Sequence, residues 1–275
     1  MFAAATFALL TMSGIAQASI DPDCQEVADG GTPAGYSEQG QTDYLLNYFA
    51  MATSFSPLHA PVPHKAGHGS VGVELAFIPA LSCERRLVLD YTKTEDTNKA
   101  PVAPRPRILF AFPEIGRVVP YAGLGYVPPI TVFGTRNVII SGEAGVGVPF
   151  DSGFSFGARY HATLMKPIAE IATPFNSADA AVDDFYMGST FGVDALFGWD
   201  FDGWEPYLAG GFTDASTFFY IGDDGVVSNK LNPYASFVGS AGIQAKVIKH
   251  VDLAAEFYAA PGVIYTGRAR AAYRW

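Results

Sequence analysis

Three arginines near the end of the chain, Arg268, Arg270 and Arg274, are separated by even numbers of residues. Two carboxylates, Asp252 and Glu256, show the same even spacing shortly before them. Successive side chains of a β-strand point to opposite faces, so each set would lie on one face of a strand. Guanidinium and carboxylate groups arranged in this way can pair across neighbouring strands or bind a solute of opposite charge. We expect Glu256 to contact Arg268 or Arg270.

The face opposite these arginines is uncharged, because every odd-numbered residue from Val263 to Trp275 lacks a charge. In a soluble sandwich such a face would form the core and the arginines would point into water. In a membrane barrel the same face would meet lipid, and the arginines would line a polar interior.

The same alternation of charged and apolar residues predicts polar faces on earlier strands. Glu74, for example, lies between Val73 and Leu75, and Arg159 precedes Tyr160. The residues that we expect to point into the lumen are Glu74, Arg86, Asp90, Arg107, Glu143, Arg159, His161, Asp194, Lys246, Asp252, Glu256, Arg268, Arg270 and Arg274.

Composition favours the membrane over the soluble alternative. Charged residues make up 16% of the 275 residues, below the roughly 25% that is usual for soluble domains, and aromatic residues make up 14%. The polar faces are rich in Gly, Ser and Thr, as a confined interior requires, and aromatic residues gather near strand ends. A net charge of −10 argues against a nucleic-acid partner.

Strand-like segments follow one another, and short connections alternate with longer ones. Outer-membrane barrels have short turns at one end and longer loops at the other. The sequence therefore predicts an all-β, up-and-down antiparallel transmembrane β-barrel of about 12 strands, with 10 as the alternative. The strands are expected at 42–55, 69–78, 83–91, 105–112, 118–127, 138–148, 154–164, 185–199, 206–220, 234–247, 251–259 and 263–275. The first of these could also be a short helix.

The N-terminal region predicts export. An apolar run ends at Ala16-Gln17-Ala18, which fits a signal-peptide cleavage site. We expect a signal peptide at 1–18, a flexible periplasmic segment at 19–41 and the barrel at 42–275. Export permits a disulfide between the two cysteines, Cys24 and Cys83, although two free thiols are the alternative.

The last strand, with Tyr273 and Trp275 at alternate positions, resembles the C-terminal signature of bacterial outer-membrane β-barrel proteins. The final residue in that family is usually Phe, so Trp275 is a departure. The resemblance covers about residues 42–275 and identifies no subfamily. It implies that Tyr273 and Trp275 form an assembly signal, that the protein lies in the bacterial outer membrane, and that its partners are outer-membrane lipids and the barrel-assembly machinery. Small solutes are a further candidate partner; the oligomeric state stays open.

No set of residues predicts catalysis. His68 with Ser70 and His161 with Thr163 share strand faces, but neither pair has the His-x-Ser-Asn pattern of barrel phospholipases. His59, His64 and His68 could bind a metal, yet solvated loop histidines are more common, so we expect no metal, no cofactor and no enzyme activity.

The sequence thus predicts a porin-like passive solute channel, or a structural or surface barrel with a charged lumen. A salt-bridged lumen and an anion-selective pore both fit the arginines. A transporter that binds hydrophobic or lipid-like ligands is the alternative, favoured if a loop or the N-terminal segment plugs the lumen. A secreted soluble β-protein is the third candidate.

Overall fold

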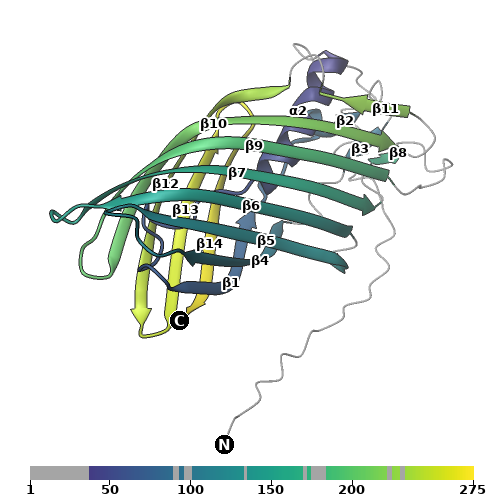
Figure 1. Cartoon of the computed structure of the whole chain (residues 1–275). Coiled ribbons are helices and arrows are strands. Elements are labelled where there is room, and N and C mark those ends of the chain that lie inside the picture. The colour runs from purple at the N-terminus through teal and green to yellow at the C-terminus, as the bar shows by residue number, and fades with distance from the viewer. Residues whose placement is uncertain are drawn as a thin grey trace, which may run out of the picture.

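The fold is taken from a computed structural model of the whole chain (Figure 1). The structure describes residues 37–88, 93–95, 101–132, 135–169, 172–174, 184–221, 225–229 and 233–275. The predicted signal peptide, Cys24 and Asp90 lie outside the described residues.

Ten strands form a closed antiparallel barrel, in the ring order β1-β4-β5-β6-β7-β9-β10-β12-β13-β14, with β14 pairing back to β1. Neighbours in the ring are also successive in the chain, which makes the barrel up-and-down. The barrel strands are β1 (Gly69–Phe77), β4 (Val102–Ala111), β5 (Val119–Val132), β6 (Thr135–Pro149), β7 (Phe154–Ala169), β9 (Asp184–Trp199), β10 (Trp204–Ile221), β12 (Tyr234–Ile248), β13 (Val251–Ala260) and β14 (Ile264–Arg274).

The all-β, up-and-down fold class is confirmed with ten strands, and the count of twelve is wrong. The two surplus strands were expected at 42–55 and 83–91. The first is the helix α2 (Glu38–Thr53), which was the stated alternative there. The second holds the short helix α3 (Cys83–Arg86) and β2 (Leu87–Val88), which pairs with β3 (Lys93–Glu95) and, through it, with β8 (Ala172–Pro174) outside the barrel wall.

The two ends of the barrel differ. One end carries the tight connections 112–118, 150–153, 200–203 and 249–250, and the last residue, Trp275, lies there because its N–H donates to the Gly69 carbonyl (3.1 Å). We call this the turn end. The loop end carries the connections 78–101 and 222–233, and α2 lies there beside β10 and β11 (Gly225–Ser228) (Figure 1). None of the helices in the described ranges is long and apolar enough to cross a membrane.

The wall has an apolar outer face and a polar inner face. Large apolar side chains are exposed on every barrel strand, for example Val73, Leu124, Phe191, Leu208 and Tyr265. The residues that alternate with them are buried and include most of the charged side chains of the strands. This alternation follows directly from the two-residue period of a strand.

The interior is filled by the chain itself. Helix α2 contacts β1, β7, β9, β10 and β14, which lie on different sides of the ring, so the helix is inside the barrel. The chain that follows α2 runs through the lumen to the turn end, where Gly67 and His68 bond to Ala111 and lead into β1. Residues 42–68 were expected to belong to the wall and its outer loops; they fill the lumen instead.

Candidate functional site: a plugged, charged lumen

We call Glu38–His64 the plug. Its central residues are among the most buried of the described chain: Phe55, Leu58, His59 and Ala60 have no exposed surface. The sequence interpretation of 56–68 as a polar outer loop fails here, because the barrel supplies partners for the polar atoms of this stretch. Its backbone forms no helix or strand, and Leu58 has a positive φ of 49°. Pro57, Pro61 and Pro63 lack N–H groups, so the stretch has fewer hydrogen bonds to satisfy.

Local sequence explains where the helical half of the plug begins and ends. Ser37 is the N-cap, and its hydroxyl accepts a bond from the Gly40 N–H (3.2 Å). The helix ends at Thr53, and Ser54 closes it by donating from its N–H and its hydroxyl to the Met51 carbonyl. Pro57 follows three residues later and cannot continue a helix.

Apolar residues of α2 meet the wall on more than one side. Leu45 and Leu46 pack with Val127, Ile139 and Met165 on one side. Another set of α2 residues, Tyr48, Ala50, Met51 and Ala52, packs with Ala215, Tyr234, Val238, Tyr258, Ala260 and Ile264. The loop end of the lumen is therefore largely apolar.

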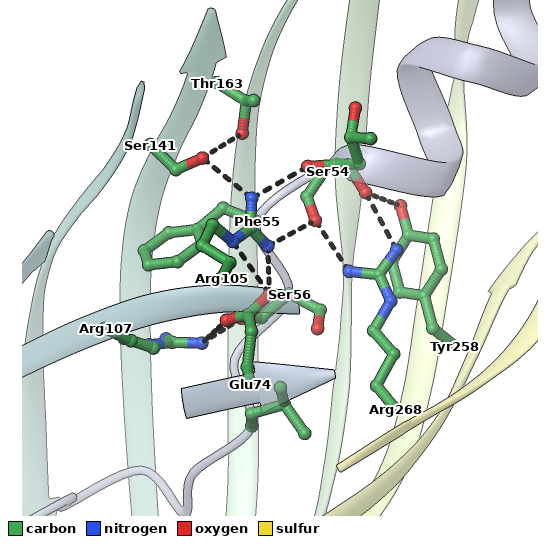
Figure 2. A network of polar contacts seen from close by, with 12 residues as sticks. Ser54, Phe55, Ser56, Glu74, Arg105, Arg107, Ser141, Thr163, Tyr258 and Arg268 are labelled. Carbon is green, nitrogen blue, oxygen red and sulfur yellow. Dashed lines mark hydrogen bonds and ion pairs between the residues drawn. The ribbon is translucent and has the colours of Figure 1, made fainter. Parts of the chain in front are cut away.

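Four wall arginines hold the point where α2 ends. Six backbone bonds join them to the plug: Arg105 to Thr53 O (2.9 Å) and Ser54 O (3.3 Å), Arg107 to Ser56 O (3.0 Å), Arg159 to Phe55 O (2.6 Å), and Arg268 to Ser54 O (2.6 Å) and Met51 O (3.0 Å). Figure 2 shows Arg105 and Arg268 reaching Ser54 from different strands. The last carbonyls of a helix lack partners within it and carry partial negative charge, so cations stabilise them.

Carboxylates of the wall neutralise three of these arginines, Arg105, Arg107 and Arg159. Glu74 accepts from Arg105 Nε (2.9 Å) and Arg107 Nη1 (3.0 Å). Glu143 accepts from Arg107 (2.5 Å) and Arg159 (2.6 Å), and Asp194 accepts from Arg159 Nε (2.8 Å). All these groups are buried, so charge compensation is required for them to stay ionised.

We call Arg105, Arg107, Arg159 and Arg268, together with Glu74, Glu143 and Asp194, the charged belt. Aromatic rings pack against its arginines. The guanidinium carbons of Arg107 and Arg105 lie 4.0 and 4.7 Å from the centre of the Phe55 ring, and that of Arg268 lies 4.1 Å from the Tyr258 ring. Such cation–π contacts add to the attraction in a desolvated site. Phe55 is thus the plug side chain that the guanidinium groups of Arg105 and Arg107 contact (Figure 2).

Polar side chains of β12 and β13 hold the non-helical half of the plug, residues 54–64. The Leu58 N–H donates to Glu256 Oε2 (3.2 Å), and the Ala60 N–H donates to Gln244 Oε1 (3.0 Å). Gln244 in turn donates to the Pro63 carbonyl (3.2 Å). Every link is between a plug backbone atom and a buried wall side chain.

The plug also brings His64 beside Ser70 and Asp252. His64 Nε2 and Ser70 Oγ share a hydrogen bond (2.8 Å), and His64 Nδ1 lies 3.7 Å from Asp252 Oδ2. These are the residue types of a nucleophile, a base and an orienting acid. However, Ser70 is 1% exposed, so a substrate cannot approach its hydroxyl while the plug is in place. The three residues fasten the end of the plug.

Glycines of the wall make room for Pro61. A Cβ atom added at Gly147 would sit on the Pro61 carbonyl oxygen, and one added at Gly157 or Gly198 would meet the Pro61 ring. These glycines come from β6, β7 and β9, which are neighbours in the ring. Small residues are therefore needed where the plug passes closest to the wall.

The structure places most of the predicted lumen residues on the inner face. Buried there are Glu74, Arg107, Glu143, Arg159, His161, Asp194, Asp252, Glu256, Arg268 and Arg270. Lys246 and Arg274 are partly exposed at the turn end, where they pair with Glu205 and with Asp252 (3.3 Å). Arg86 is buried in α3 rather than on a wall strand, and Asp90 lies outside the described residues.

The expected contact of Glu256 with Arg268 or Arg270 is not formed among the described side chains. Glu256 and Arg268 are direct partners in the β13–β14 register, but both side chains turn to the plug. Glu256 accepts from the Leu58 N–H and from the Tyr207 hydroxyl (2.9 Å), whereas Arg268 donates to plug carbonyls. The plug therefore competes with cross-strand pairing.

Sequence reasoning left Arg105 and Gln244 out of the lumen site and gave a plug only as the condition for the alternative function. The signal for Arg105 was available, because it is two residues before Arg107 and shares its strand face.

Three other predicted residues lie outside the lumen site. Tyr273 and Trp275 are 54% and 45% exposed on the outer face, and Cys83 is disulfide-bonded, while its predicted partner Cys24 lies outside the described residues.

Comparison with known proteins gives neighbours only at the level of structure. No family model matches the chain, and no curated protein matches it. The toluene transporter TodX of Pseudomonas putida is 12% identical, with a TM-score of 0.39 over 81% of this chain and 74% of TodX. The translocator domain of the autotransporter NalP from Neisseria meningitidis is 12% identical, with a TM-score of 0.40 over 77% and 90%. Ail, the attachment invasion locus protein of Yersinia pestis, is 10% identical, with a TM-score of 0.33 over 76% and 99%. These neighbours are bacterial outer-membrane β-barrels, and the similarity is too low to carry an argument about function.

Proposed function

We propose that the chain is a bacterial outer-membrane barrel that is closed along its axis by its own N-terminal plug. It acts as a structural or surface barrel, or as a binding protein for apolar ligands, rather than as an open porin-like channel. The observation that carries this proposal is the set of six arginine–carbonyl bonds across the lumen.

The energy of those bonds argues against an open pore. A hydrogen bond to a charged group contributes about 1.5–3 kcal/mol net, so six bonds amount to on the order of 10 kcal/mol. Because such contributions are not additive, half of this sum, about 5 kcal/mol, is a conservative figure, and it leaves fewer than roughly one molecule in a thousand open. A passive solute channel needs a far larger open fraction.

The outer surface supports a membrane location. Apolar side chains are exposed around the whole ring, and soluble monomers rarely expose continuous apolar patches above a few hundred Å². Trp199, Trp204, Tyr273 and Trp275 are 45–58% exposed near the turn end, as in an interfacial aromatic girdle. These features count against the secreted soluble alternative.

Planar-bilayer recordings test the proposal. The purified protein should show almost no conductance, whereas a variant that lacks residues 38–64 should conduct. Because the deletion could impair assembly, a second variant, Arg105→Gln/Arg268→Gln, weakens the plug while keeping its full length. Steady conductance of the wild-type protein would overturn the closed-barrel proposal.

A further inference from the structure

One part of the wall is not paired. The pairing of β4 with β5 runs from Ala111, opposite Tyr121, to Arg107, opposite Gly125, and ends there. β4 nevertheless continues to Val102 beside β1, and β5 continues to Val132 beside β6. We call Val102–Pro106 of β4 and Tyr126–Ile130 of β5 the seam. It lies in the half of the barrel that faces the loop end.

Proline residues on both strands cause this interruption. Pro104 and Pro106 have no N–H, yet β4 keeps an unbroken register with β1 on its other edge. Their nitrogens must then point towards β5, where they cannot donate. On β5, Pro128 and Pro129 fall within a register shift against β6, between Val127 and Ile130. The prolines therefore prevent β4 and β5 from continuing their hydrogen-bond ladder through the seam.

An unpaired stretch within a spanning wall is unusual. Backbone groups that lack partners in hydrocarbon are costly, which is why membrane barrels pair their strands around the whole ring. Prolines remove some donors but leave the carbonyls. A sequence that places four prolines at one seam bears this cost at a single position, so a role for the unpaired strands is the simplest account of it.

Apolar surface continues through the seam. Outside it, Tyr126 and Ile130 are 43% and 53% exposed. Inside it, Val127 packs with Leu45 and Leu46 of α2 and with Ile139 and Met165 of the wall. Val127 therefore joins the apolar outer face to the apolar side of α2, and Arg105 is the charged residue of the seam.

Polar contacts of Arg105 mark the end of the seam that is nearer the turn end. Arg105 crosses over Gly125, where a Cβ would clash with the arginine side chain, and donates to Ser141 Oγ of β6 (2.8 Å). Ser141 contacts Thr163 Oγ1 of β7 (3.1 Å) (Figure 2). The bonds that Arg107 and Arg159 make to the plug lie nearer the turn end than this contact, whereas Arg268 on β14 lies level with Ala103.

We propose that the seam is a lateral portal through which the acyl chain of an amphiphile reaches the apolar side of α2 from the bilayer. This inference rests on the proposed membrane barrel and names its ligand class. The portal opens into the loop-end half of the lumen, where α2 side chains rather than the charged belt would contact the chain.

Photo-cross-linking tests the portal. Benzoylphenylalanine replaces Leu46, which belongs to the cluster behind the seam, or Met51, which is equally buried in α2 but packs towards β12–β14. Each protein is reconstituted in liposomes with free alkyne-tagged palmitate, or with phosphatidylcholine that carries the tag on its acyl chain. We expect several-fold more labelling at position 46 than at position 51, and the arm that labels identifies the source of the chain.

A seam-repair variant, Pro104→Val/Pro106→Val/Pro128→Val, should reduce labelling at position 46 several-fold. Equal labelling at both positions, absence of labelling at position 46, or labelling that ignores the repair would overturn the portal. Each protein is also run boiled and unboiled on a gel. If the heat-dependent shift persists, only the portal has failed; if the wild-type protein lacks the shift, the membrane barrel itself is wrong.

Discussion

Glu143 joins two wall arginines to a histidine of the plug. It accepts from Arg107 and Arg159, and His59 Nε2 of the plug lies 3.3 Å away. Removing the charge of one member of a buried network leaves the others uncompensated, which costs more than the pair contributes when intact. The stability of the wall and the retention of the plug therefore depend on the same carboxylate.

Glu143→Gln should destabilise the barrel by about 3–5 kcal/mol, because two buried guanidinium groups each lose one of their two carboxylate partners. Arg117→Gln is the control, since Arg117 and Asp151 form a pair that is 69% and 96% exposed. That control should change stability by less than about 1 kcal/mol. Urea titration followed by the unboiled gel form measures both. Equal losses would contradict the special position of Glu143.

Glu256→Gln should destabilise the barrel less than Glu143→Gln. The glutamine oxygen can still accept from the Leu58 N–H, and no arginine contacts Glu256 within the described lumen. The guanidinium nitrogens of Arg270 have no hydrogen-bond partner among the described residues. The same urea titration ranks the two variants, and a larger loss for Glu256→Gln would show that Arg270 depends on Glu256 electrostatically.

Most of the lumen charges could be predicted at the residue scale, because strand periodicity assigns each residue to a face without knowledge of its partners. The partners themselves could not. Arg268 and Glu256 were expected to meet as register neighbours, but strand spacing says nothing of a third segment between them that offers carbonyl and N–H groups to both.

At the element scale the largest difference between prediction and structure is the plug, which was expected to be a wall strand and an outer loop. Helix α2 is apolar on several sides because it is surrounded by wall, so its sequence shows neither a clean helical stripe nor a strand alternation. Residues 54–68 are rich in proline and histidine, which is typical of an exposed loop. Only the presence of the barrel around them gives their polar atoms partners.

Gly147→Ala should displace the plug, because the new methyl group would overlap the Pro61 carbonyl. We expect faster tryptic cleavage after the exposed Lys65 and brief conductance events in bilayers. The matched control is Gly142→Ala on the same strand, where the nearest atom to an added Cβ is 3.8 Å away. Identical behaviour of the two variants would mean that the plug adapts without moving.

At the scale of the whole molecule, the ring closes between its first and last strands. Ser70 pairs with Arg274, Val71 with Tyr273, and the Trp275 N–H bonds to Gly69. The alternating short and long connections were enough to predict this up-and-down closure and the even strand number. The count itself was not predictable, since α2 and 83–91 resemble strands in composition.

Deletion of residues 273–275 should block assembly, both by removing the proposed signal and by shortening the closing pair. Deletion of residues 19–21 is the control of equal length and should have little effect. Membrane fractionation and the heat-dependent gel shift report the outcome. Mild and equal effects of the two deletions would count against an assembly signal at Tyr273 and Trp275.

Because Cys83 is oxidised and the sequence has one other cysteine, we expect a Cys24–Cys83 disulfide. Mass spectrometry of unreduced peptides should find this link, and Cys83→Ser should lower stability by about 2–5 kcal/mol. A free Cys24 thiol in the exported protein would contradict the pairing.

The position of the plug in the chain constrains the order of assembly. The plug precedes β1, so it is synthesised before any strand of the wall that encloses it. A ring closed around an empty lumen would bring Arg105, Arg107, Arg159 and Arg268 together without the carbonyls that they bind, and the plug would then have to enter through one end of a finished barrel. The wall is thus expected to wrap around the plug, which serves as its internal template. A permuted chain that carried the plug after β14 would have every native contact available and yet should fold slowly, because its last-made segment would have to enter a finished ring.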